Sequence, residues 1–232
     1  MKHFICENKI IVFFLVVSKL VIILHFVSLD KPEWFPHAGD AFDVLHNIAI
    51  GYVVNFFFYV TQIYIPSVKR NKIIYSCINE RLTEIGNTMT DLFEGITGVK
   101  KPYDDSFFEE LLAVRLNAPT KIGDASKSNS DRIVYFTLRE LLWNNINTTN
   151  NKIDTFISYY KEYLQPEIML DLDAIKNSLL HKAIKTVLVC PGDYKFKNMN
   201  ETNYYKQYYE LAINLLKDNK KYYSGNNDGN IN

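Results

Sequence analysis

The chain has 232 residues, and its 26 basic and 26 acidic side chains give a formal net charge of zero at pH 7. A neutral balance offers no basic surface of the kind that nucleic-acid-binding domains use, so we expect no nucleic-acid partner. Hydrophobic residues make up 47% of the chain but crowd into its first 65 positions, and the roughly 165 residues that follow are enough for one sizeable core.

The first apolar stretch covers residues 10–29 and is interrupted near its middle by Lys19. At about 1.5 Å per residue, a helix of this length crosses a hydrocarbon core of roughly 30 Å. A cleaved signal peptide is the alternative, with Lys2 and Lys9 as its basic region. However, no small-residue cleavage site follows, and the apolar run resumes after Lys19. We therefore expect a first transmembrane helix.

The second apolar stretch covers residues 44–65 and is followed by Lys69, Arg70 and Lys72. The connecting loop, residues 30–43, has four acidic residues and one lysine. Basic residues mark the cytoplasmic ends of membrane helices. The sequence therefore predicts a transmembrane hairpin within residues 1–68, with an outer loop and both termini in the cytoplasm.

Polar residues within these spans are the candidate site. Asn47, Gly51 and Asn55 are four apart and share a helix face, and Gln62 falls close to the same stripe. Three interpretations of this stripe and of Lys19 remain open. The first is an ion path, or an oligomer interface with a wet lumen. The second is a seam between the two helices of the hairpin, with Lys19 reaching towards the headgroups. The third is a shift in the register of the first span that brings Lys19 to the membrane–water interface.

Residues 69–223 are predicted to form a helical-bundle domain in the cytoplasm, and residues 224–232 a disordered tail. The first helix of this domain carries apolar residues alternately four and three apart, which favours packing within the bundle over a coiled coil: Ile78, Leu82, Ile85, Met89, Leu92 and Ile96. Gly95 and Gly98 mark its end. The fold class is therefore all-α.

The next helix is predicted to begin at an Asp105 or Ser106 cap, and residues 119–130 to form a polar loop. A long helix then follows a Ser130 or Asp131 cap, with a turn possible at residues 147–151.

Pro166 is predicted to open a further helix that ends near Cys190, because proline is favoured at the first helical position. Residues 185–190 are compatible with one short strand. The last helix, residues 203–222, is rich in tyrosine. Its tyrosines with Lys206 leave single-stranded nucleic acid or a membrane interface as alternatives to ordinary packing.

No motif for catalysis or cofactor binding stands out. The chain has no phosphate-binding glycine motif, no HExxH and no GxSxG. Cys6, Cys77 and Cys190 form no CxxC pair, and two histidines, His25 and His46, do not predict a metal site without a third ligand. We expect a protein that is not an enzyme and has no cofactor and no metal.

The second span carries a Gly51-Tyr52 step, an aromatic run over residues 57–59 and a Tyr64-Ile65-Pro66 end before basic residues. In these features the chain resembles uncharacterised bacterial membrane proteins that pair an N-terminal two-helix transmembrane hairpin with a helical cytoplasmic domain. Residues 160–180 are similar to the helix-turn-helix near the end of such proteins. The resemblance implies a bacterial inner or cell membrane and transfers no catalytic residue.

Two functions remain open. The first is a membrane-anchored interaction or sensing protein, with the lipid bilayer and a cytoplasmic protein as partners. The second is a small oligomeric pore or membrane-perturbing effector that self-associates through its spans, with Lys19, Asn47 and Asn55 lining the assembly.

Overall fold

The computed structural model describes residues 2–28, 36–98, 103–123, 135–189, 192, 195 and 203–224. The chain divides into two compact units, Met1–Ile73 and Ile74–Asn232. The described residues are mainly α-helical and include two short strands, so the all-α class is confirmed. Part of the predicted outer loop and nearly all of the predicted tail lie outside the described residues.

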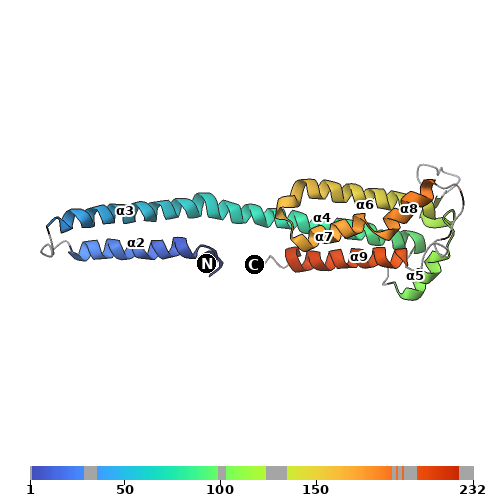
Figure 1. The fold of residues 1–232 in the computed structure, drawn as a ribbon, viewed down its shortest axis with the longest axis horizontal. Coiled ribbons are helices and arrows are strands. Elements are labelled where there is room, and N and C mark those ends of the chain that lie inside the picture. The colour runs from blue at the N-terminus through green and yellow to red at the C-terminus, as the bar shows by residue number, and fades with distance from the viewer. Residues whose placement is uncertain are drawn as a thin grey trace. The chain divides into compact units, whose positions relative to one another are not determined.

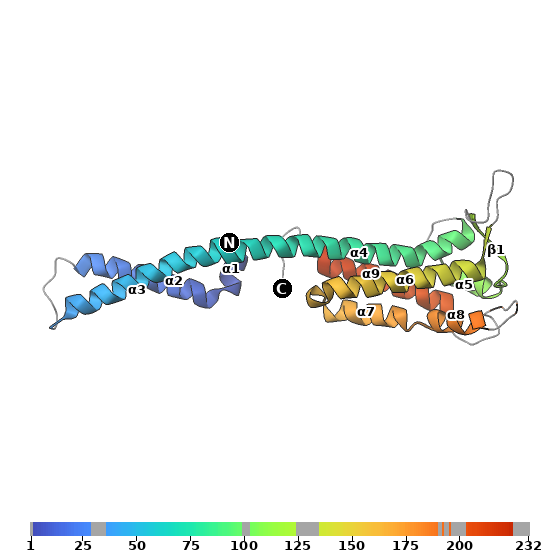
Figure 2. The same cartoon turned by 90° about the horizontal axis from the view of Figure 1, so that it is seen from above.

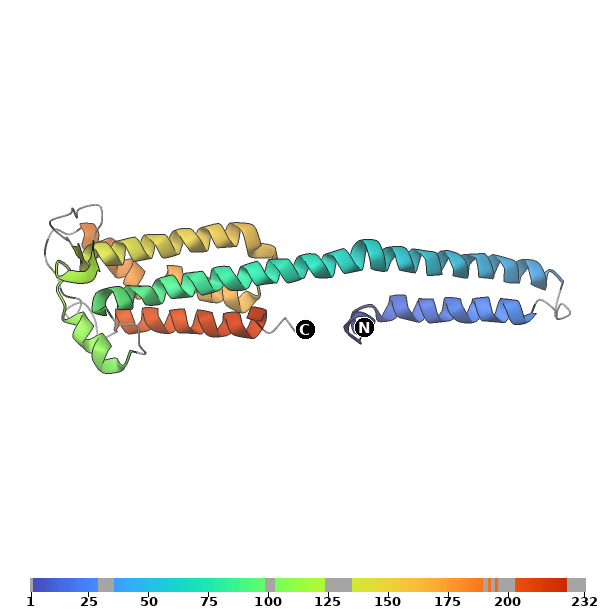
Figure 3. The ribbon, with the colours of Figure 1, turned by 180° about the vertical axis from the view of Figure 1, so that it is seen from behind.

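The first unit is built from two long helices that lie side by side (Figures 1 and 3). Its elements are α1 (Lys2–Glu7), α2 (Lys9–Ser28), α3 (Ala38–Phe58), the π-helical segment η1 (Tyr59–Tyr64) and the start of α4 (Ile65–Thr97). Both α2 and the continuous helical segment Ala38–Thr97 are long and apolar enough to cross a membrane.

Pro66 does not end the helix that the second apolar stretch forms. It is the second residue of α4, and α4 directly follows η1. A proline lacks the N–H for the helical hydrogen bond, and its ring crowds the carbonyl four residues earlier. The π-helical segment η1, which ends two residues before Pro66, widens the backbone here, so the helix continues without a break.

The second unit consists mainly of helices, and Figures 1 and 3 show α4, α6 and α9 running alongside one another. Figure 2 shows β1 beside the N-terminal end of α6, and the two elements are in contact. Besides α4 the elements are α5 (Asp105–Leu112), β1 (Pro119–Gly123), β2 (Tyr135–Thr137), α6 (Leu138–Tyr160), η2 (Lys161–Tyr163), α7 (Pro166–Lys176), α8 (Leu179–Val189), α9 (Tyr204–Asn219) and η4 (Lys220–Ser224).

Side-chain caps set the helix starts, and two of them differ from the sequence prediction. Asp104, one residue before the predicted caps, accepts a hydrogen bond from the backbone N of Phe107 at 2.9 Å. Helix α6 begins after Thr137 rather than after Ser130 or Asp131, because Thr137 and Glu140 form a capping box. Residues 135–137 instead pair antiparallel with β1, which occupies the start of the predicted polar loop.

Two further predictions for the later helices are wrong. Helix α6 runs through residues 147–151 without a turn, and Thr149 is buried there. Residues 185–189 belong to helix α8 rather than to a strand. The predicted helix from Pro166 does begin there but ends at Lys176, so that α7 and α8 are separate.

The core of the second unit collects the periodic apolar residues of its helices. Ile78, Leu82, Ile85, Met89 and Leu92 of α4 are all buried, so this face packs inside the chain as predicted. Tyrosines of α9 are also buried, namely Tyr204, Tyr205 and Tyr208. Their burial removes them as a stacking surface for nucleic acid or for a membrane. Gly98, with φ of 75°, ends α4 at the predicted place.

Candidate functional site

The five candidate polar residues of the predicted spans face away from the contact between α2 and α3. Asn47, Gly51 and Asn55 are exposed on α3, and Gln62 is exposed in η1. We call these four residues the amide stripe. A Cβ atom at Gly51 would meet nothing within 4 Å. Lys19 is exposed on α2, and the structure shows no hydrogen bond that joins it to the stripe among the described residues. The interpretation of the stripe as a seam inside the hairpin is therefore wrong.

Other residues fill the contact between α2 and α3. His25 and Ala49 are buried there, and the rings of His25 and His46 stack with their centroids 4.1 Å apart. The hydroxyl of Tyr52 donates to the carbonyl of Ile11 at 2.9 Å. Among the described residues no group of three His, Cys, Asp or Glu side chains could hold a metal ion.

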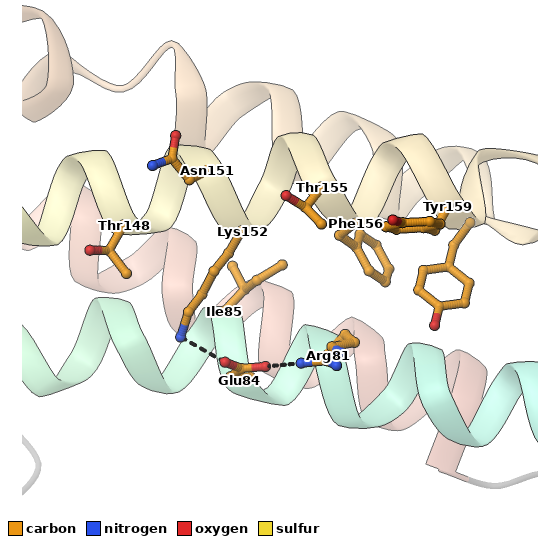
Figure 4. Close-up of a pocket in the computed structure, with 10 residues that line it drawn as sticks. Arg81, Glu84, Ile85, Thr148, Asn151, Lys152, Thr155, Phe156 and Tyr159 are labelled. Carbon is orange, nitrogen blue, oxygen red and sulfur yellow. Dashed lines mark hydrogen bonds and ion pairs between the residues drawn. The ribbon is translucent and has the colours of Figure 1, made fainter.

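A groove of about 530 Å³ lies between α4 and α6 in the second unit (Figure 4). Helix α4 contributes two charged residues and one apolar residue. Helix α6 contributes hydroxyl, amide, amine and aromatic side chains. The lining residues are Arg81, Glu84, Ile85, Thr148, Asn151, Lys152, Thr155, Phe156, Tyr159 and Tyr160. Ten residues from two adjacent helices therefore share one open surface.

The charges of the groove centre on Glu84, which lies between two cations (Figure 4). Lys152 Nζ is 2.9 Å from Glu84 Oε1, and Arg81 Nη1 is 2.9 Å from Glu84 Oε2. Hydrogen bonds from Lys152 and Arg81 lower the pKa of Glu84, and the same carboxylate raises the pKa of Arg81. Glu84 therefore stays ionised and holds both cations in place.

The groove exposes a cationic guanidinium and an aromatic ring to solvent. A guanidinium has five N–H donors. Arg81 bonds to Glu84 through Nη1, and its side chain is 61% exposed. Tyr159 is 75% exposed and offers an aromatic face with a polar tip. Arg and Tyr are the side chains that most often dominate protein interfaces.

A hydrogen-bond network ties the groove to the interior. Lys152 Nζ donates to Thr88 Oγ1 at 2.8 Å, and Asn145 Nδ2 donates to the Thr88 carbonyl at 2.6 Å. The Tyr208 hydroxyl donates to Asn145 Oδ1 at 3.1 Å. Helices α4, α6 and α9 are thus connected by polar contacts, which hold Lys152 in a defined position.

His181 lies beside this network and is 1% exposed, with its ring centroid 5.3 Å from that of Tyr208. Burial lowers its pKa to about 4, although the backbone of Lys176 opposes the shift. The imidazole is therefore neutral at pH 7 and serves as a core side chain.

Sequence reasoning did not identify the groove. The Arg81 and Glu84 spacing of three residues was a usable signal, because such pairs are neighbours on a helix. Lys152 and Tyr159 lie about 70 positions further along, and only the packing of α6 on α4 brings them to the same surface. Comparison of the chain with protein families, with curated proteins and with solved structures finds no match.

Proposed function

We propose that this chain is a membrane-anchored interaction protein. A two-helix hairpin, with spans at about residues 10–29 and 44–65, tethers a helical-bundle domain to a bacterial inner or cell membrane. The domain and both termini lie in the cytoplasm, where the groove between α4 and α6 receives a segment of a partner protein. No catalytic step is part of this proposal.

The observation that carries the anchor is the distribution of exposed apolar side chains. Among the described residues, all but six of the exposed large hydrophobic residues belong to the first unit. The six in the second unit are Ile122, Tyr135, Trp143, Tyr159, Leu170 and Ile213. Soluble proteins rarely expose large continuous apolar surfaces, and a helix pair that is apolar on its outer faces suits the hydrocarbon core of a bilayer.

The charge pattern supports the proposed orientation. Lys69, Arg70 and Lys72 are exposed at the start of α4, whereas Asp40 and Asp43 are exposed at the opposite end of α3. Basic residues near a membrane span favour the cytoplasmic side. The end of α3 that carries the two aspartates is therefore assigned to the outer side.

The groove supports a binding role through its exposed Arg81 guanidinium and Tyr159 ring, because Arg and Tyr are frequent anchors of protein interfaces. The pore alternative is less well supported, because the amide stripe faces away from α2, where Lys19 lies. Within one chain these polar residues do not line a common path.

Single-cysteine labelling tests the anchor and its orientation. In a background with Cys6→Ser, Cys77→Ser and Cys190→Ser, one variant carries Asp40→Cys and its control carries Asn87→Cys, both at exposed positions. A membrane-impermeant maleimide should label only the Asp40→Cys variant in intact spheroplasts. Both variants should react after permeabilisation.

Two results would contradict the proposal. One is labelling of the Asn87→Cys variant in intact spheroplasts, which would place the second unit outside. The other is recovery of the wild-type chain in the supernatant after ultracentrifugation without detergent, which would mean that the first unit is not embedded in a membrane.

A further inference from the structure

The amide stripe has no partner within the described chain. Asn47 and Asn55 are exposed on α3, and no hydrogen bond satisfies either amide among the described residues. The contact between α2 and α3 lies on the opposite face, where Ala49 is buried. The hydrocarbon core contains no water, so an unpaired amide there is unfavourable. If α3 spans the membrane, this face requires a polar partner at the same depth.

Gly51 lies at the centre of the stripe and allows a second helix to approach closely. Asn47 and Asn55 are each four residues away, which is about 6 Å along a helix axis. An added Cβ at Gly51 would meet only open space, so the backbone is uncovered there. Small residues flanked by hydrogen-bonding side chains are typical of helix contacts within membranes.

We propose that the amide stripe is the interface of a parallel homodimer, in which α3 of one chain packs against α3 of a second copy. This inference rests on the proposed function, because it requires the first unit to span the membrane. A second copy inserts in the same orientation and presents the same stripe at the same depth. An asparagine amide both donates and accepts hydrogen bonds, so the stripe is complementary to itself, as a two-fold interface requires.

Disulfide cross-linking in native membranes tests the geometry. In the cysteine-free background, Gly51→Cys places a thiol at the predicted two-fold axis. The control, Ala49→Cys, lies two residues away at nearly the same depth but on the face that packs against α2. Mild oxidation should give a dimer band for Gly51→Cys and little for Ala49→Cys. Equal cross-linking of the two variants, or none with Gly51→Cys, would overturn the dimer.

The second measurement is the mass of the full chain in mild detergent, by light scattering. The wild-type protein should have the protein mass of two 27.1 kDa chains. The Asn47→Leu, Asn55→Leu double variant should dissociate at least about tenfold more readily, because hydrogen bonds of this kind contribute on the order of a tenfold factor each. Lys19→Leu, on α2, is the control and should leave the dimer intact.

Failure of the dimer can be separated from failure of the anchor. Labelling of Asp40→Cys alone in spheroplasts, together with a monomeric wild-type mass, would refute only the dimer. A defined higher oligomer whose liposome conductance falls with Lys19→Leu would also refute the dimer and would favour the pore. Loss of the labelling asymmetry would refute the anchor itself.

Discussion

His181 shows how a single buried side chain makes the second unit sensitive to pH. Its imidazole is 1% exposed, and burial lowers its pKa to about 4 from an ordinary value near 6.5. Between these two values the unfolded chain binds a proton that the folded chain does not. The stabilisation is therefore fully present above about pH 6.5 and is lost as the pH falls towards 4.

We expect the free energy of unfolding to fall by up to about 3 kcal/mol over this window. The measurement is urea unfolding of the detergent-solubilised full chain, followed by circular dichroism between pH 4 and 7. His181→Phe should flatten the dependence, whereas the control His37→Phe, at an exposed histidine, should not. A slope that is the same in wild type and His181→Phe would show that His181 is not responsible.

Glu84 differs from His181 because it is a charged side chain at the surface rather than a neutral one in the core. Its lowered pKa comes from hydrogen bonds to Lys152 and Arg81, and both of its oxygens are engaged. Because its side chain is 43% exposed, solvent screens these ion pairs and limits their contribution to stability. Their role is to hold the two cations in position at the groove.

At the scale of whole elements, the contact between α4 and α9 depends on a residue without a side chain. A Cβ atom at Gly86 would lie 2.6 Å from Cγ of Leu216. The hydrogen bond from Asn219 Nδ2 to the Asn79 carbonyl, at 3.0 Å, holds the same two helices together. The close approach of α4 to α9 therefore requires glycine at position 86.

We expect Gly86→Ala to lower the free energy of unfolding by about 1–3 kcal/mol, because the added methyl group overpacks the contact. Asn87→Ala, at the adjacent exposed position, is the control and should have little effect. Leu216→Ala should relieve the overlap, so that a double-mutant cycle measured by urea unfolding gives favourable coupling. Additive effects would mean that the two residues do not compete for the same space.

Some features of the helices could be predicted from sequence patterns alone. The apolar repeat from Ile78 to Leu92 predicted the buried face of α4, and Pro166 predicted the start of α7. The sequence prediction placed the start of α6 too early, because several Ser, Asp and Thr residues precede the helix and each is a favoured N-cap. Only the reciprocal bonds between Thr137 and Glu140 select one of them. The run at residues 147–151 suggested a turn, but the contact of Thr149 with Tyr208 stabilises the helix there.

At the scale of the whole molecule, an anchored protein with a recognition groove is expected to meet its partner in the cell. We predict that a photo-cross-linking amino acid in place of Tyr159 gives a defined adduct in living cells. The same amino acid in place of Leu170, which is equally exposed but lies on α7, serves as the control. Its adduct should be absent, because α7 does not line the groove.

Arg81→Glu should reduce the adduct from position 159 by about fivefold or more, since loss of one favourable charge contact weakens binding by about 1 kcal/mol. The readout is the yield of the shifted band on a denaturing gel. An adduct that is insensitive to Arg81→Glu, or equally strong from position 170, would argue that the groove is not the recognition surface.

The sequence by itself determined the helical class, the two apolar stretches and the buried face of α4, because length, hydropathy and periodicity are local properties of the chain. Only the tertiary structure decided which faces meet. It placed the amide stripe on the outer side of α3, and it brought Lys152 of α6 next to Arg81 and Glu84 of α4, which lie about 70 positions earlier in the sequence. The physical reason is that a helical pattern defines a face but not its neighbour, which depends on how side chains from distant segments fit against one another.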